Sequence, residues 1–81
     1  MKVKEILCRM SGDALVTIIN HRDEIVIDCD TTDRISAFGD VDKEVHSILR
    51  SDVIKIKVGE VHHDLILFLA KYDADNGRIT R

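Results

Sequence analysis

The feature that most constrains the fold is an uninterrupted apolar run at residues 65–70, Leu-Ile-Leu-Phe-Leu-Ala. A β-strand points successive side chains to opposite faces of its sheet, so a strand of this sequence is apolar on both faces. In a chain of 81 residues, few other elements are available to cover the second face. The run therefore predicts a strand buried centrally between a helix and a loop, or a strand covered by a partner or by a second copy of the chain.

The composition is that of one small folded domain. Hydrophobic residues make up 44% of the chain and charged residues 33%, a balance typical of globular proteins rather than disordered ones. Aromatic residues are only 4%, so the core must be built from Ile, Val and Leu, which favours sheet. We expect a single domain over residues 1–70 and a polar C-terminal tail over residues 71–81.

The order of the elements follows from the apolar spacing. A short amphipathic helix opens the chain, and strands are predicted at residues 14–19 and 24–29, joined by a tight polar turn. A second helix is predicted to begin at Asp40 as its N-cap, whereas residues 30–39 fit either a short helix or a loop. Strands at residues 53–58 and 65–70 close the chain. The predicted fold is α+β, in the order α-β-β-α-β-β, with a four-stranded antiparallel sheet and one or two helices packed on one face.

The strand at residues 53–58 alternates strictly between aliphatic and basic side chains. We expect its aliphatic residues to face the core and Lys55 and Lys57 to face solvent. The predicted core then combines the apolar stripe of the second helix with sheet residues from both hairpins. These sheet residues are Ile18, Ile25, Ile27, Ile54, Ile56, Val58 and Leu67.

The residual apolar stripe of the last strand predicts an oligomer interface. Ile66, Phe68 and Ala70 share one side of that strand, and Leu65 adjoins them. Burying about three such side chains is worth several kcal/mol, enough to support a symmetric dimer. We expect a homodimer, with coverage of the stripe by the tail after Lys71 as the alternative.

Charge is distributed unevenly along the chain. The formal net charge is −3, but residues 22–44 hold eight acidic and three basic residues. Bulk binding of nucleic acid calls for a dominant basic stripe, which the sequence lacks. The acidic stretch instead predicts a partner-binding surface that could occupy a basic groove, formed by Asp23, Glu24, Asp28, Asp30, Asp33, Asp40 and Asp42.

The sequence carries no catalytic motif. Its serines lack the Gly-x-Ser-x-Gly context, and its four glycines form no phosphate-binding loop. Asp28, Asp30 and Asp33 lack the glycine and distal glutamate of a calcium loop. His62 and His63 would point in opposite directions on an extended segment, so they do not chelate one ion. We expect no enzymatic activity, no metal and no cofactor.

The two cysteines, Cys8 and Cys29, are expected to be reduced and buried, because the chain opens directly on an amphipathic pattern without a signal peptide. No apolar run approaches the roughly 20 residues needed to span a bilayer. These features predict a protein of the cytoplasm with no membrane partner.

Three segments carry a resemblance. The opening Met-Lys-Val-Lys-Glu-Ile-Leu, the run Ser-Asp-Val-Ile-Lys-Ile-Lys-Val and the run Asp-Leu-Ile-Leu-Phe-Leu resemble, in pattern, small accessory proteins encoded by phages and mobile elements of Gram-positive bacteria. Some small acidic phage proteins of this size, anti-CRISPR proteins among them, inhibit host defence by binding a nuclease or its ligand. The modest net charge of this chain departs from strong DNA mimics.

The resemblance implies a non-enzymatic interaction protein that binds and inhibits a host defence protein, itself possibly one that binds nucleic acid. Two alternatives stay open. One is an oligomer that sequesters a small ligand in a pocket at the subunit seam. The other is a weak nucleic-acid-binding regulator that uses Lys2, Lys4, Lys55 and Lys57.

Overall fold

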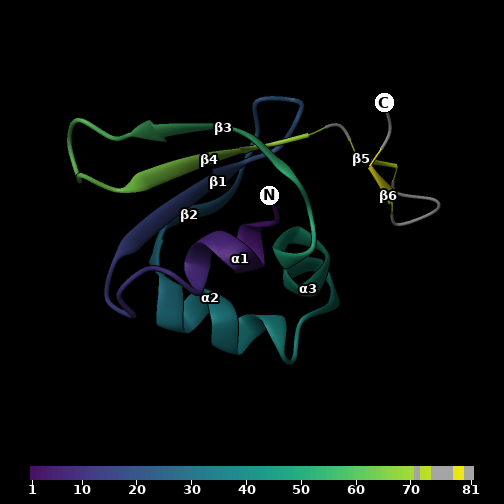
Figure 1. Ribbon diagram of the computed structural model, residues 1–81, viewed down its shortest axis with the longest axis horizontal. Helices are drawn as coiled ribbons and strands as arrows, with labels where there is room; N and C mark the ends of the chain where they lie inside the picture. The colour runs from purple at the N-terminus through teal and green to yellow at the C-terminus, as the bar shows by residue number, and fades with distance from the viewer. Residues whose placement is uncertain (71, 74–77, 80–81) are drawn as a thin grey trace.

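The α+β fold is seen in a computed structural model that describes residues 1–70, 72–73 and 78–79. The elements follow one another in the order α-β-β-α-α-β-β before the tail, and helices α1, α2 and α3 lie together on one side of the sheet (Figure 1). Their bounds are α1 Val3–Leu7, β1 Leu15–Ile19, β2 Ile25–Thr31, α2 Thr32–Gly39, α3 Lys43–Leu49, β3 Val53–Val58 and β4 Leu65–Leu69.

The four-stranded sheet is mixed, with the strand order β2-β1-β4-β3. The β1–β2 and β3–β4 pairs are antiparallel hairpins, but β1 and β4 run parallel, so the prediction of a fully antiparallel sheet is wrong at this pair. Each hairpin holds one almost wholly apolar strand and one strand with charged residues. Central strands are buried on both edges and most of both faces, whereas edge strands tolerate charge. The two apolar strands therefore take the centre and pair with each other.

Strand β4 accommodates its apolar run by lying between β1 and β3. Leu67 and Leu69 are buried against the helices, while Ile66 and Phe68 are half-buried on the opposite face of the sheet. Burial inside the sheet thus accounts for much of the run without a second chain. Whether the remaining surface is an oligomer interface stays a prediction.

Both internal helices begin at a polar cap. The Thr31 hydroxyl accepts from the backbone N–H of Arg34 at 3.3 Å, which starts α2, so residues 30–39 contain a helix rather than only a loop. The Asp42 carboxylate accepts from the N–H groups of Glu44 and Val45 at 2.9 and 3.2 Å and starts α3. The predicted N-cap Asp40 is wrong by two positions, because Asp40 is the C-cap of α2.

The core forms where the central strands meet the helices. Its buried apolar members come from α1, β1, α2, α3 and β4, and Ile27 and Val53 pack partly buried against them. Ile18, Leu67 and Ile27 were predicted correctly. The fully apolar buried set is Val3, Ile6, Leu7, Val16, Ile18, Ile35, Leu49, Leu67 and Leu69.

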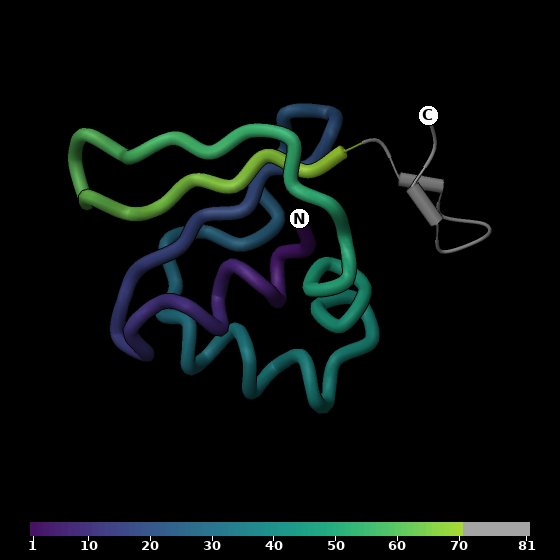
Figure 2. The backbone as a smooth tube through the Cα atoms, in the orientation of Figure 1, coloured from purple at the N-terminus to yellow at the C-terminus, as the bar shows by residue number. Residues whose placement is uncertain are grey.

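Four residues predicted for the core are exposed instead: Ile25, Ile54, Ile56 and Val58. They lie on the two edge strands, and the helices cover mainly the central pair. The tip of the β3–β4 hairpin projects past the helices (Figure 2). In addition, a register shift between Val53 and Lys55 sets Ile54 outside the regular alternation of β3.

The C-terminal segment holds two short strands, β5 (Tyr72–Asp73) and β6 (Arg78–Ile79), which pair antiparallel with each other. The rest of the predicted tail, residues 71, 74–77 and 80–81, lies outside the described residues. The division into a domain at 1–70 and a tail at 71–81 stays a prediction.

Replacing Leu67 with alanine should lower the free energy of unfolding by about 2–5 kcal/mol, because this side chain is fully buried and its removal leaves a cavity. The matched control is Ile56→Ala on the neighbouring strand, where the side chain is half exposed and the loss should be about 1 kcal/mol or less. Urea unfolding followed by circular dichroism measures both. Absence of a folded baseline in Leu67→Ala counts as a large loss, whereas equal losses in the two variants would contradict the assignment of β4 to the core.

Candidate functional site: the free edge of strand β3

Strand β3 forms one edge of the sheet, and among the residues that the structure describes no strand pairs with its outer side beyond Val53. The N–H of Gly59 donates to the carbonyl of Asp64 at 2.8 Å. Hydrogen-bonded and non-hydrogen-bonded pairs alternate along an antiparallel ladder. Counting back from Gly59, every second residue bonds to β4, so Lys57 and Lys55 form the next hydrogen-bonded pairs. The main-chain N–H and C=O of Ile56 and Val58 therefore point away from β4, toward the outside of the sheet.

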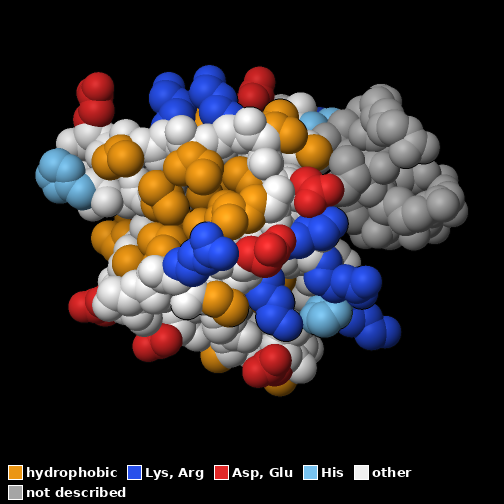
Figure 3. All heavy atoms as spheres, in the orientation of Figure 1, with side chains coloured by type: hydrophobic (Ala, Val, Ile, Leu, Met, Phe, Trp, Pro, Cys, Tyr) orange, Lys and Arg blue, Asp and Glu red, His pale blue; other side chains and the backbone are white. Residues whose placement is uncertain are grey.

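The side chains of residues 54–58 give this edge an aliphatic face and a basic face. Ile54, Ile56 and Val58 are 70%, 50% and 67% exposed. Apolar side chains gather over β3 and β4 in the space-filling view (Figure 3). Lys55 and Lys57 lie on the opposite face of the strand from Ile56 and Val58, and the Lys55 ammonium sits 5.3 Å from the centre of the Phe68 ring. We call residues 54–58 the β3 edge.

The N-terminal residues define where the β3 edge begins. Met1 accepts a hydrogen bond from the N–H of Val53 at 2.8 Å, and Lys2 pairs with Asp52 both as a β-bridge and through an ion pair of 3.1 Å. The outer side of residues 52–53 is thus already occupied. A partner strand can pair only from Ile54 onward.

The predicted acidic surface is divided among several elements. Asp23 and Glu24 belong to the β1–β2 turn, and Asp33 lies in the first turn of α2. Asp28 and Asp30 lie on β2, at the opposite edge of the sheet from β3, and Asp40 and Asp42 flank the α2–α3 connection. Asp30 pairs with Arg34 at 3.3 Å, Asp42 caps α3, and Glu24 accepts from the Asn20 side chain at 3.1 Å, so three of the seven have local structural roles. Partner binding by this set stays a prediction.

The predicted oligomer residues do not share one face. Leu65 packs against the core from the helix side, whereas Ile66 and Phe68 lie on the opposite face; these three and Ala70 are only partly exposed. The more exposed apolar side chains are Ile54, Ile56 and Val58 of the β3 edge, which the sequence predicts to face the core. The strict Ile-Lys alternation at residues 54–57 was the available signal, but alternation alone does not say which face a partner layer covers.

The basic residues considered for nucleic-acid binding are also separated. Lys55 and Lys57 lie on β3, Lys2 pairs with Asp52, and Lys4 lies on α1. Two neighbouring lysines without interleaved aromatic side chains give a weak electrostatic footprint for nucleic acid.

Cys29 lies in a polar cluster formed by β1, β2 and the residue before β4. The buried Thr17 hydroxyl donates to the Asp64 carboxylate and accepts from the N–H of Cys29 at 3.0 Å. Desolvation raises the pKa of the Cys29 thiol, and the carboxylates of Asp64, Asp28 and Asp30 raise it further. Because the thiolate is the nucleophile, this environment opposes cysteine catalysis. Cys8 is exposed and Cys29 is half-buried, so the prediction that both cysteines are buried is wrong for Cys8 and met only in part for Cys29.

Within the described ranges, no group of three or more His, Cys, Asp or Glu side chains is placed to hold a metal ion. Among the helices of the same residues, none is both long and apolar enough to cross a membrane. Comparison of the chain with protein-family models, with curated proteins and with solved structures finds no match.

The raised pKa of Cys29 predicts slow alkylation. In a Cys8→Ser background, Cys29 should react with iodoacetamide more slowly in the folded protein than in urea, because less thiolate is present at mildly alkaline pH. The same shift makes folding less favourable as pH rises through the unfolded-state pKa, since the unfolded chain then releases its proton first. Mass spectrometry of timed samples measures the rates, and Thr17→Val tests the cluster. Equal rates in folded and unfolded protein would contradict this account of Cys29.

Proposed function

We propose that this chain is a non-enzymatic interaction protein that binds an extended segment of a partner protein along the β3 edge. One observation carries the proposal. The main-chain hydrogen-bonding groups of Ile56 and Val58 point away from β4 at the sheet edge, and the aliphatic side chains of the same two residues are exposed to solvent. Strand addition to a sheet edge uses this combination, since main-chain bonds supply affinity and alternate side chains supply specificity.

The two faces of the β3 edge specify the partner's chemistry. A strand paired with β3 sets its own side chains opposite Lys55 and Lys57 on one face and opposite Ile56 and Val58 on the other. Opposite charges across two strands stabilise the pair, and apolar pairs bury the exposed aliphatic groups. The fitting occupant is therefore an extended segment in which acidic and apolar residues alternate.

A second copy of β3 fits this edge poorly. In a symmetric antiparallel pair centred on Ile56, Lys55 of each chain faces Lys57 of the other. Moving the centre by one residue in either direction sets Lys55 or Lys57 opposite its own copy. Like charges directly opposite each other destabilise a strand pair. The homodimer expected through β4 is a separate proposal, and it concerns the opposite face of the sheet.

The partner class that we propose is a host defence protein. Support comes from the resemblance of the sequence to small phage and mobile-element accessory proteins. Strand addition would inhibit such a target by occupying a segment that it needs for its own contacts. The acidic residues on β2 lie at the far edge of the sheet, so they would provide a second, independent contact to a basic region of the same partner.

A short synthetic peptide that alternates valine and glutamate should bind the full chain, and a valine–lysine peptide should not. Reversing both charges, Lys55→Glu with Lys57→Glu, should weaken the acidic peptide by about tenfold or more and favour the basic one. Backbone amide shifts of residues 54–58 and fluorescence anisotropy of labelled peptide are the readouts.

Matched isoleucines on the two edges provide the control. Ile56→Thr should weaken binding, whereas Ile25→Thr on β2, where the side chain is similarly exposed, should leave it unchanged. Light scattering identifies the alternative occupant: a particle of twice the 9.2-kDa chain mass that dissociates on Ile56→Thr would assign the edge to a second copy. That result, or acidic-peptide binding insensitive to the charge reversal, would overturn the proposal.

A further inference from the structure

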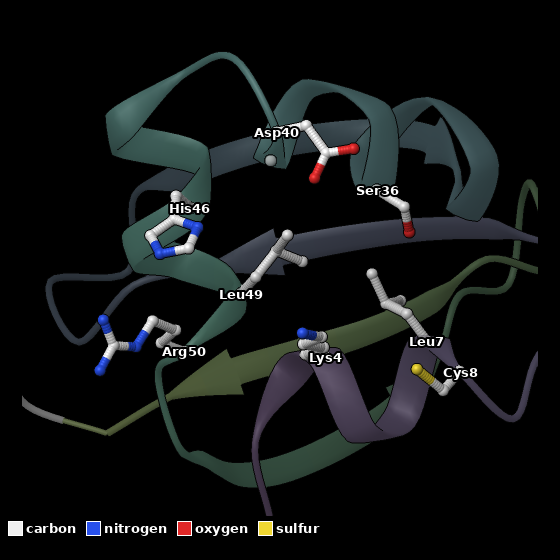
Figure 4. Close-up of a pocket in the computed structure, with 9 residues that line it drawn as sticks. Lys4, Leu7, Cys8, Ser36, Asp40, His46, Leu49 and Arg50 are labelled. Carbon is white, nitrogen blue, oxygen red and sulfur yellow. The ribbon is translucent and has the colours of Figure 1, made fainter.

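A second site lies among the helices. Between α1, α2 and α3 the surface is hollowed to a volume of about 450 Å³ (Figure 4). Leu7 and Leu49, both core residues, face the hollow from α1 and α3, and Gly39 closes it at the end of α2. This volume falls in the range of small-molecule sites, which combine an apolar body with a few polar groups. None of its lining residues belongs to the β3 edge.

Gly39 lets the end of α2 pack directly against Leu49 at the hollow. A Cβ at this position would lie 2.2 Å from Cδ1 of Leu49, far inside a van der Waals contact. The end of α2 and the last turn of α3 can approach this closely only because residue 39 has no side chain. Leu49 is thereby held at the bottom of the hollow.

Five polar side chains surround the hollow. Lys4 comes from α1, His46 and Arg50 come from α3 and its C-cap, and Ser36 and Asp40 come from α2 and its C-cap. Within the described residues, none of these five side chains takes part in a hydrogen bond or an ion pair. The hydrogen-bonding groups of these side chains, which surround the apolar side chains of Leu7 and Leu49, are thus available to a ligand.

The fixed charges around the hollow favour an anion. Lys4 and Arg50 are positive and Asp40 is negative, so this hollow is locally positive on a chain of net charge −3. Arginine and lysine side chains bind carboxylates and phosphates through charge-assisted hydrogen bonds. We propose that the hollow binds a small organic anion: Lys4 and Arg50 attract its carboxylate or phosphate, and its apolar body lies on Leu7 and Leu49.

The test uses the full chain and defined probes of similar size. Phenyl phosphate and benzoate carry the proposed anion on an apolar ring, benzamide is neutral, and benzylamine carries the opposite charge. The two anions should shift the backbone amides of Lys4, Gly39 and Leu49 in a saturable way, and benzamide and benzylamine should not. Whichever anion binds more tightly identifies the phosphate or the carboxylate as the preferred group.

Variants separate this site from general electrostatics. Lys4→Gln and Arg50→Gln should each weaken binding of the tighter-binding anion at least fivefold. Lys43→Gln, at an exposed position of α3 that does not line the hollow, should leave binding unchanged. Ser36→Phe should abolish binding by filling the hollow without removing a charge. Ser36 is exposed, so this variant is expected to fold, and its amide spectrum verifies that.

Three outcomes would overturn the proposal. They are equal binding of benzamide and the anions, shifts that map to residues outside the hollow, and loss of binding in Lys43→Gln as large as in Lys4→Gln. Peptide binding at the β3 edge is measured separately, so failure of either site leaves the other assignment standing.

Discussion

The structure depends on one packing contact, between the parallel pair of central strands and the three short helices. Val16 and Ile18 on β1 and Leu67 on β4 are fully buried, and they meet Val3 from α1 and Ile35 from α2. Full burial of each such side chain is worth about 1.5–3 kcal/mol. In a domain of this size little else is available to offset the conformational entropy of folding. The remaining elements are arranged around this contact.

The two candidate sites follow from the small size of the helical layer. Helices of five, eight and seven residues cover the central strands but leave the outer strand β3 without an apolar layer against it. The same short helices meet one another at their ends, where Gly39 and Leu49 approach closely and polar side chains surround a hollow. An exposed aliphatic edge and a polar-rimmed hollow are both consequences of a core that is just large enough.

Charge gives the two edges of the sheet opposite characters. Strand β2 carries Asp28 and Asp30, and strand β3 carries Lys55 and Lys57. Charged residues on edge strands hinder uncontrolled pairing between copies of a protein, because like charges meet when identical edges approach. On β3 the same lysines discriminate among partner strands, so protection from self-association and selectivity for an acidic segment have one physical origin.

The sequence by itself determined the type of nearly every element, because helix and strand periods are local properties that can be read within a window of residues. It also determined the α+β class, the two hairpins and the central burial of Leu67. The parallel pairing of β1 with β4, the placement of Ile54, Ile56 and Val58 at an open edge, and the hollow around Lys4 and Arg50 were decided only by the tertiary structure. Each depends on which segments distant in the chain become neighbours, and alternation within a strand fixes two faces without saying which of them another layer will cover.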